Sequence, residues 1–309
     1  MKKIPHISTL QTTGVILVCL FHSLVGEAEG SFLYSWIHLF VIPLFVYLSG
    51  YLFSYTNQEL KNPRVFLVRK TKRLLVPYWL ISSLAFIPKS LLSSLAIRPV
   101  PLTWTAYFRM LLYPFDNVII YYWFIPTLFV ILLVAYGFFR FAPNVLRQPL
   151  PVLTALVILH FFNPLRGIMF INLEGVVEHL IFFGLGYYSC SVRLHDMIEG
   201  NKYWLAGLSL AVTIICVRYS DTQLTDFIGT LCGIIMCVTA ALLYHAKNYS
   251  FLQHMEGAYY TIYLLSWFPQ VFSYHILNHF FDVPLIITIL LSWISGVYVP
   301  LVIHRLFKL

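Results

Sequence analysis

Long apolar blocks separated by short polar segments follow one another along this chain. The block from Leu128 to Phe139, for example, is continuous and shows no strand-like alternation. A helix of roughly 20 residues crosses a hydrocarbon core of about 30 Å, whereas a barrel would show alternating strands of about 10 residues. Backbone polar groups must also be paired inside lipid. The pattern therefore predicts an all-α, polytopic membrane helical bundle.

The apolar blocks predict about ten transmembrane helices, which we treat as a single membrane domain over residues 1–309. The segment 149–162 is short, so nine or eleven spans are the alternatives. The longest polar stretch, Thr56 to Arg73, is expected to be a loop. The predicted spans are 8–26, 33–54, 74–97, 118–140, 149–162, 174–192, 203–218, 224–246, 257–275 and 283–304.

The positive charges predict the orientation of these spans. With ten spans and both termini in the cytoplasm, 15 of the 20 Lys and Arg residues fall on the cytoplasmic side. Cytoplasmic segments of membrane proteins are enriched in Lys and Arg. The sequence thus predicts a strongly basic cytoplasmic face that contacts membrane lipid.

The composition agrees with a membrane protein. The chain is 60% hydrophobic and only 10% charged, whereas soluble domains carry about 25% charged residues. Its five cysteines include no CxxC pair, so they are expected to be small buried hydrophobes. His275 and His279 have the spacing of a helical metal site, but no third ligand is evident, and no metal is expected. Nucleic acid is not an expected partner.

A histidine near the end of the first predicted span is the first candidate for chemistry. His22 is either an interfacial residue among lipid headgroups or a functional group, since ionisable residues at membrane depth are functional candidates by default. A histidine also titrates near neutrality, as a general base must.

Two further features follow His22 along the chain. The second span contains Pro43, which kinks or loosens a helix, and the small pair Ser49-Gly50, which permits close packing. The basic segment Arg69 to Arg73 comes next. It is either a topogenic cluster touching anionic lipid or a phosphate site.

The order and spacing of these features resemble the acyltransferase 3 family of bacterial membrane acyltransferases. The resemblance covers nearly the whole chain, and the first 80 residues carry most of its specificity. Further matches are Tyr122-Trp123-Phe124, Phe183 to Tyr187 and Ile262 to Leu265. The three matching motifs are Leu17 to Ser23 around the histidine, Leu44 to Leu52 with its Ser-Gly pair, and Lys70 to Tyr78 with its basic pair and proline.

The resemblance implies a membrane O-acyltransferase of the bacterial cytoplasmic (inner) membrane, most often an O-acetyltransferase. The donor would be acetyl-CoA or another acyl-CoA, with no permanently bound cofactor. The acceptor would be a hydroxyl of a cell-surface or exported glycan, or of a lipid-linked sugar. The implied site has His22 as the catalytic residue and Arg69, Lys70 and Arg73 on the coenzyme A phosphates. Ser49, Glu178 and Asp226 are candidates for supporting roles, the two carboxylates as groups that orient His22.

Two alternatives stay open at this point. One is a glycan flippase or polymerase, which would also have ten or more spans and few charges. The other is an inactive, acyltransferase-like scaffold, because the chain departs from the family at several positions. One departure is Lys70, which stands where the family has the first arginine of its basic pair and lacks the planar fork of an arginine.

Overall fold

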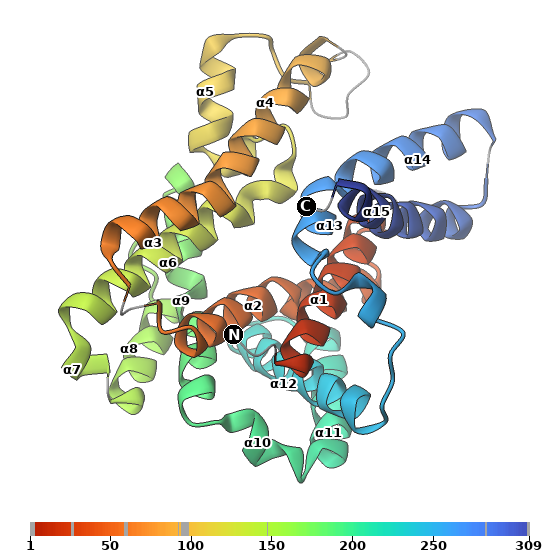
Figure 1. Cartoon of the computed structure of the whole chain (residues 1–309). Helices are drawn as coiled ribbons and strands as arrows, with labels where there is room; N and C mark the ends of the chain where they lie inside the picture. Colours follow the sequence, from red (N-terminus) through yellow and green to blue (C-terminus); the bar gives the residue numbers. More distant parts are fainter. Residues whose placement is uncertain are drawn as a thin grey trace. The chain divides into compact units, whose positions relative to one another are not determined.

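The structure, a computed structural model, describes residues 4–25, 28–58, 61–91, 93, 99–146, 148–281 and 283–307. In these residues all regular secondary structure is helical (Figure 1). The prediction of an all-α membrane protein is confirmed. Five helices of the described part are long and apolar enough to cross a membrane: Phe32–Tyr55, Pro63–Leu91, Ile120–Phe141, Gln223–Ala246 and Leu285–Phe307.

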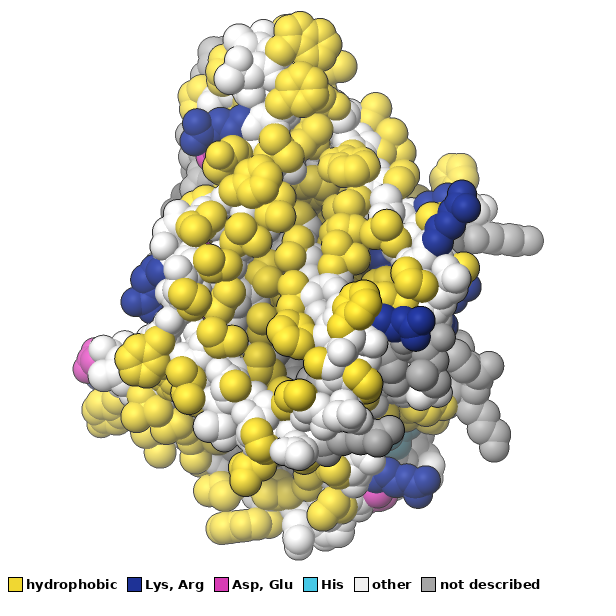
Figure 2. Space-filling model, turned by 90° about the vertical axis from the view of Figure 1, so that its left-hand side faces the viewer, with side chains coloured by type: hydrophobic (Ala, Val, Ile, Leu, Met, Phe, Trp, Pro, Cys, Tyr) yellow, Lys and Arg dark blue, Asp and Glu magenta, His cyan; other side chains and the backbone are white. Residues whose placement is uncertain are grey.

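Helices also cover most of the other predicted segments, although these helices are shorter or less apolar. One of them is α8 (Pro149–Phe161), which corresponds to the short predicted span 149–162. The full count of ten crossings and the cytoplasmic position of both termini stay predictions. Side chains of one face, drawn in Figure 2, are mostly apolar with scattered Lys and Arg, as a surface in contact with lipid requires.

The chain divides into two compact units, and α2 (Phe32–Tyr55) contributes to both. The first unit is Met1–Leu48 with Arg193–Leu309, and the second unit is Ser49–Val192. The interpretation of 1–309 as one domain is not tested by this division.

In the first unit, α1 packs against helices from the C-terminal part of the chain. Buried Val15 and Cys19 of α1 form an apolar cluster with Ile262 and Val297. The indole Nε1 of Trp293 also donates a hydrogen bond to the carbonyl oxygen of Ile16, at 3.0 Å. The helices of this unit, besides the first part of α2, are α1 (Pro5–Ser23), α10 (Leu194–Glu199), α11 (Lys202–Arg218), α12 (Gln223–Ala246), α13 (Tyr259–Leu265), α14 (Trp267–Phe280) and α15 (Leu285–Phe307).

In the second unit, the Ser49-Gly50 pair allows the end of α2 to approach α9 closely. A Cβ atom at Gly50 would overlap with the carbonyl oxygen of Phe183 and lie 2.9 Å from its carbonyl carbon. The close approach that the sequence predicted at this pair is therefore present. The helices of this unit are α3 (Pro63–Lys70), α4 (Val76–Leu91), α5 (Trp104–Leu112), α6 (Phe124–Phe141), α7 (Pro143–Leu146), α8 and α9 (Leu173–Ser191).

The basic segment is helical, so the prediction of a loop up to Arg73 is wrong. After Asn62, α3, a π-helical turn (Thr71–Leu75) and α4 follow one another without interruption (Figure 1). The side chain of Asn62 accepts a hydrogen bond from the backbone N–H of Arg64 at 2.9 Å, and Pro63 occupies the first helical position. Both features start helices. They outweigh the polar composition of the segment, and the helix begins at Pro63 rather than at 74.

Candidate functional site

His22 lies in the last turn of α1, in the first unit, and its side chain is half-buried. Its ring meets the ring of Phe21 edge to face, with centroids 5.3 Å apart. Phe21 in turn stacks on two rings of α2, those of Tyr34 at 4.6 Å and His38 at 5.4 Å. The histidine thus stands at a helix end that is bordered by aromatic side chains.

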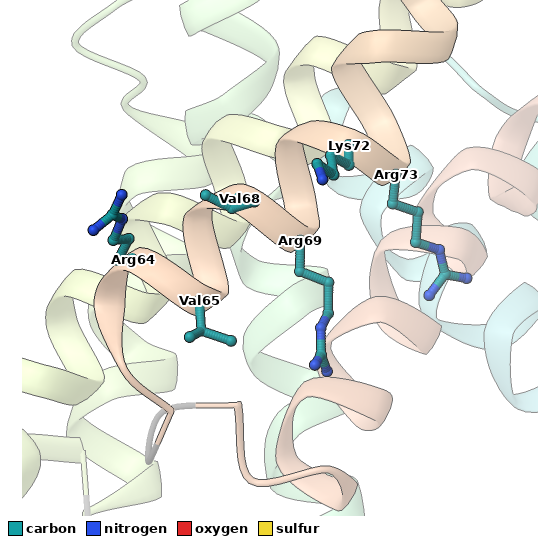
Figure 3. A pocket seen from close by; sticks show the side chains of 6 residues that line it. All are labelled: Arg64, Val65, Val68, Arg69, Lys72 and Arg73. Atoms are coloured by element: carbon teal, nitrogen blue, oxygen red, sulfur yellow. The ribbon is translucent and has the colours of Figure 1, made fainter.

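Four cations of the second unit lie around one cavity, and we call them the basic face: Arg64, Arg69, Lys72 and Arg73. The cavity is largely open to the surface and has a volume of about 590 Å³; its lining residues, which include Val65 and Val68, all belong to one helix (Figure 3). All four basic residues are exposed. In Figure 3, Arg69 and Arg73 extend from the same side of the helix, as residues four apart do.

Lys70 lies away from this cavity. Its side chain is half-buried, and its Nζ stands 5.5 Å from the centre of the Phe66 ring, in the geometry of a cation–π contact. Phe66 stacks on Tyr136 of α6 at 4.3 Å. Of the three residues predicted to bind phosphate, Arg69 and Arg73 therefore line the cavity, and Lys70 does not. The phosphate-binding role of Lys70 stays a prediction.

Sequence reasoning left Arg64 and Lys72 out of the site. The signal was present in the spacing, because residues 64, 68 and 72 follow one another at four-residue steps, as do 65, 69 and 73. Such residues share a face only if the segment is a helix, and the prediction of a loop concealed this relation.

The electrostatics of the basic face favour an anion. Between residues 61 and 115 the sequence contains no Asp or Glu. The pKa of nearby Lys61 is lowered, first by burial and then by the positive charge of Arg69. The helix also contains the π-helical turn Thr71–Leu75, and such turns are frequent at functional sites. Clustered cations that repel one another favour binding of a ligand with several negative charges, because such a ligand relieves the repulsion.

The three supporting candidates have different environments. Ser49 is half-buried beside Gly50, at the close approach to α9. The side chain of Glu178 is exposed, while its backbone carbonyl is hydrogen-bonded to Nδ1 of His160 at 2.8 Å. Asp226 lies in the first turn of α12, and its carboxylate accepts a hydrogen bond from the hydroxyl of Ser220. Their proposed roles toward His22 stay predictions.

A buried histidine of the first unit, His195 of α10, was not singled out from the sequence. It is only 2% exposed, and both of its ring nitrogens have partners. Nε2 is hydrogen-bonded to the hydroxyl of Tyr47 at 2.8 Å, and Nδ1 to Nε2 of His6 at 3.0 Å. Burial, and then the neighbouring His6, lower the pKa of His195 to about 3. No local spacing could reveal this cluster, because its members come from three separate parts of the chain.

These observations define a helical membrane protein with a histidine at a helix end and a separate polycationic face. The family model described as an acyltransferase domain matches residues 5–305, essentially the whole chain. The chain belongs to this acyltransferase family, and the resemblance drawn from the sequence motifs is confirmed. A search of the curated proteins and of the solved structures gives no significant match. Membership of the family makes this a membrane acyltransferase.

Proposed function

We propose that the protein is an acetyl-CoA-dependent O-acetyltransferase of the bacterial cytoplasmic membrane, with both termini in the cytoplasm. It would transfer an acetyl group to a hydroxyl of a cell-surface or exported glycan, or of its lipid-linked precursor. The observation that carries this proposal is the basic face: four cations around one cavity, on a helix without acidic residues, in a member of an acyltransferase family.

The chemistry of the donor fits the basic face. Coenzyme A carries several phosphate groups, and arginine binds phosphate through two parallel hydrogen bonds in addition to its charge. Arg69 and Arg73 would bind one phosphate group from the same side of the helix. Arg64 and Lys72 would meet a second, while Val65 and Val68 offer apolar contact to the rest of the donor.

His22 would act as the general base. A ring nitrogen takes the proton of the acceptor hydroxyl while the hydroxyl oxygen attacks the carbonyl carbon of the thioester. The carbon–sulfur bond then breaks, and the departing thiolate takes the proton from the imidazolium. The products are the ester and free coenzyme A, with no net proton released. General base catalysis by a positioned side chain contributes about 10²- to 10⁴-fold to the rate.

Membranes that contain the protein, supplied with radiolabelled acetyl-CoA and candidate glycans, test this proposal. We expect label in sugar with the wild-type protein and none with His22→Ala at the same membrane level. His254→Ala is the matched control, since His254 is an exposed histidine of the same unit. Wild-type labelling by His22→Ala would refute the role of His22. Movement of lipid-linked glycan without label in sugar would indicate a transporter instead.

A further inference from the structure

Gln270 of α14 reaches the turn of α1 that carries His22. Its side chain is 5% exposed, and both residues belong to the first unit. The amide nitrogen Nε2 donates hydrogen bonds to the carbonyl oxygen of Cys19 at 2.6 Å and to the hydroxyl of Ser23 at 2.8 Å. Ser23 directly follows His22 and donates to the same Cys19 oxygen at 2.9 Å. One side chain thus contacts the helix on both sides of the histidine.

The hydrogen-bond partners determine which way the carboxamide of Gln270 points. A backbone carbonyl oxygen can only accept a hydrogen bond, so the nitrogen of the amide must face Cys19. The amide oxygen Oε1 therefore points elsewhere. It is buried, and no donor in the described part of the chain reaches it. A buried acceptor without a donor costs about 1–3 kcal/mol.

Packing holds Gln270 in this position. Gly296 of α15 lies against the side chain, and a Cβ atom there would stand 2.5 Å from Cγ and 2.7 Å from Cδ of Gln270. The absence of a side chain at 296 is therefore what makes room for the glutamine. An apolar residue in this buried place would avoid the unsatisfied oxygen and its cost of about 1–3 kcal/mol. A destabilising group kept in a fixed position is typical of a functional site.

We propose that Gln270 is a positioning residue for His22, an inference that rests on the proposed function. The last turn of a helix lacks part of its helical hydrogen bonds, so a helix end frays easily. By holding Cys19 and Ser23, Gln270 fixes the turn between them and so the direction of the His22 ring. A general base has to be positioned accurately, because a displacement of the catalytic group by about 1 Å can lower the rate about 100-fold.

Two variants of Gln270 test the inference in membranes with labelled acetyl-CoA and the glycan of the expressing cells. Gln270→Met keeps the length of the side chain and removes its hydrogen bonds. We expect kcat to fall about 10- to 100-fold, with the KM for acetyl-CoA and the yield of folded protein unchanged. Gln270→Glu regains a donor when its carboxyl group is protonated, so its activity relative to wild type should rise as the pH falls.

The matched control is Ser273→Ala, which removes a hydrogen bond between α14 and α15, from Ser273 to Ser295, and leaves α1 untouched. It should retain the wild-type kcat. An unchanged kcat in Gln270→Met, or an equal loss in Ser273→Ala, would overturn the inference. Absence of label with the wild-type protein would instead count against the proposed function.

A second measurement does not depend on activity. Diethyl pyrocarbonate modifies histidine rings, and mass spectrometry gives the rate at His22 in the purified protein. Loss of the two hydrogen bonds should raise this rate several-fold in Gln270→Met and leave it unchanged in Ser273→Ala. An unaltered rate in Gln270→Met would show that Gln270 does not hold the ring.

Discussion

The buried His195 should make the stability of the protein depend on pH, and His195→Gln should reduce that dependence. In the folded protein the pKa of His195 is lowered to about 3, because the ring is buried among Tyr47 and His6. In the unfolded chain it returns to about 6.5. The unfolded state therefore binds one more proton between these two values, and the stability falls as the pH falls from about 6.5 toward 3.

The size of the effect follows from the two pKa values. At pH 5, about 1.5 pH units below the pKa in the unfolded chain, the ring is protonated in the unfolded chain and neutral in the folded protein. Each of these pH units lowers the free energy of unfolding by about 1.36 kcal/mol. His195 alone should lower the free energy of unfolding by about 2 kcal/mol between pH 7 and pH 5. Glutamine in its place does not titrate and can still hydrogen-bond with Tyr47.

Thermal unfolding of the purified protein in detergent, at pH 7 and pH 5, measures this difference. Between these two conditions, the wild-type Tm should fall by several degrees more than the Tm of His195→Gln, whatever the absolute stability of the variant. His254→Gln, at an exposed histidine of the same unit, is the control and should behave as the wild type. Equal losses of Tm in wild type and His195→Gln would refute the assignment of the pH dependence to His195.

Two further predictions concern the second unit. Gly50→Ala should destabilise the protein by about 1–3 kcal/mol, since the added Cβ overlaps with the backbone of Phe183; the measurement is the Tm in detergent. Gly137→Ala, within α6 and with open space around it, should be neutral or slightly stabilising. Arg69→Gln should raise the KM for acetyl-CoA about 10-fold or more, as loss of a charged hydrogen bond does. Lys70→Gln should raise that KM less than Arg69→Gln does, because Lys70 packs against Phe66 and does not line the cavity.

Clear outcomes would contradict these two predictions. A Gly50→Ala protein with the wild-type Tm would mean that α2 and α9 do not approach as closely as the structure shows. For the basic face, the control is Arg109→Gln, an exposed arginine of the same unit whose partner is Asp116 at 2.6 Å. If Arg109→Gln or Lys70→Gln raises the KM as much as Arg69→Gln does, the cations contribute only general charge and the cavity is not the donor site.

The sequence by itself determined the class of the protein. The length and continuity of apolar blocks such as Leu128 to Phe139 depend on local composition alone, and the need to pair backbone groups in lipid leaves helices as the outcome. The motifs around His22, Ser49-Gly50 and Lys70 to Tyr78 were sufficient to predict the family. The close approach at Gly50 was also predictable, because a residue without a side chain next to a serine allows helices to meet.

Only the tertiary structure decided which side chains act together. Arg69 and Lys70 are neighbours in sequence, but successive helical residues point about 100° apart, so one lines the cavity and the other packs on Phe66. The prediction of a loop could not show this difference. Gln270 and Cys19 are separated by 251 positions. Such contacts arise when whole helices pack together. The orientation of each packed helix then determines which distant side chains meet, and no local sequence pattern contains that information.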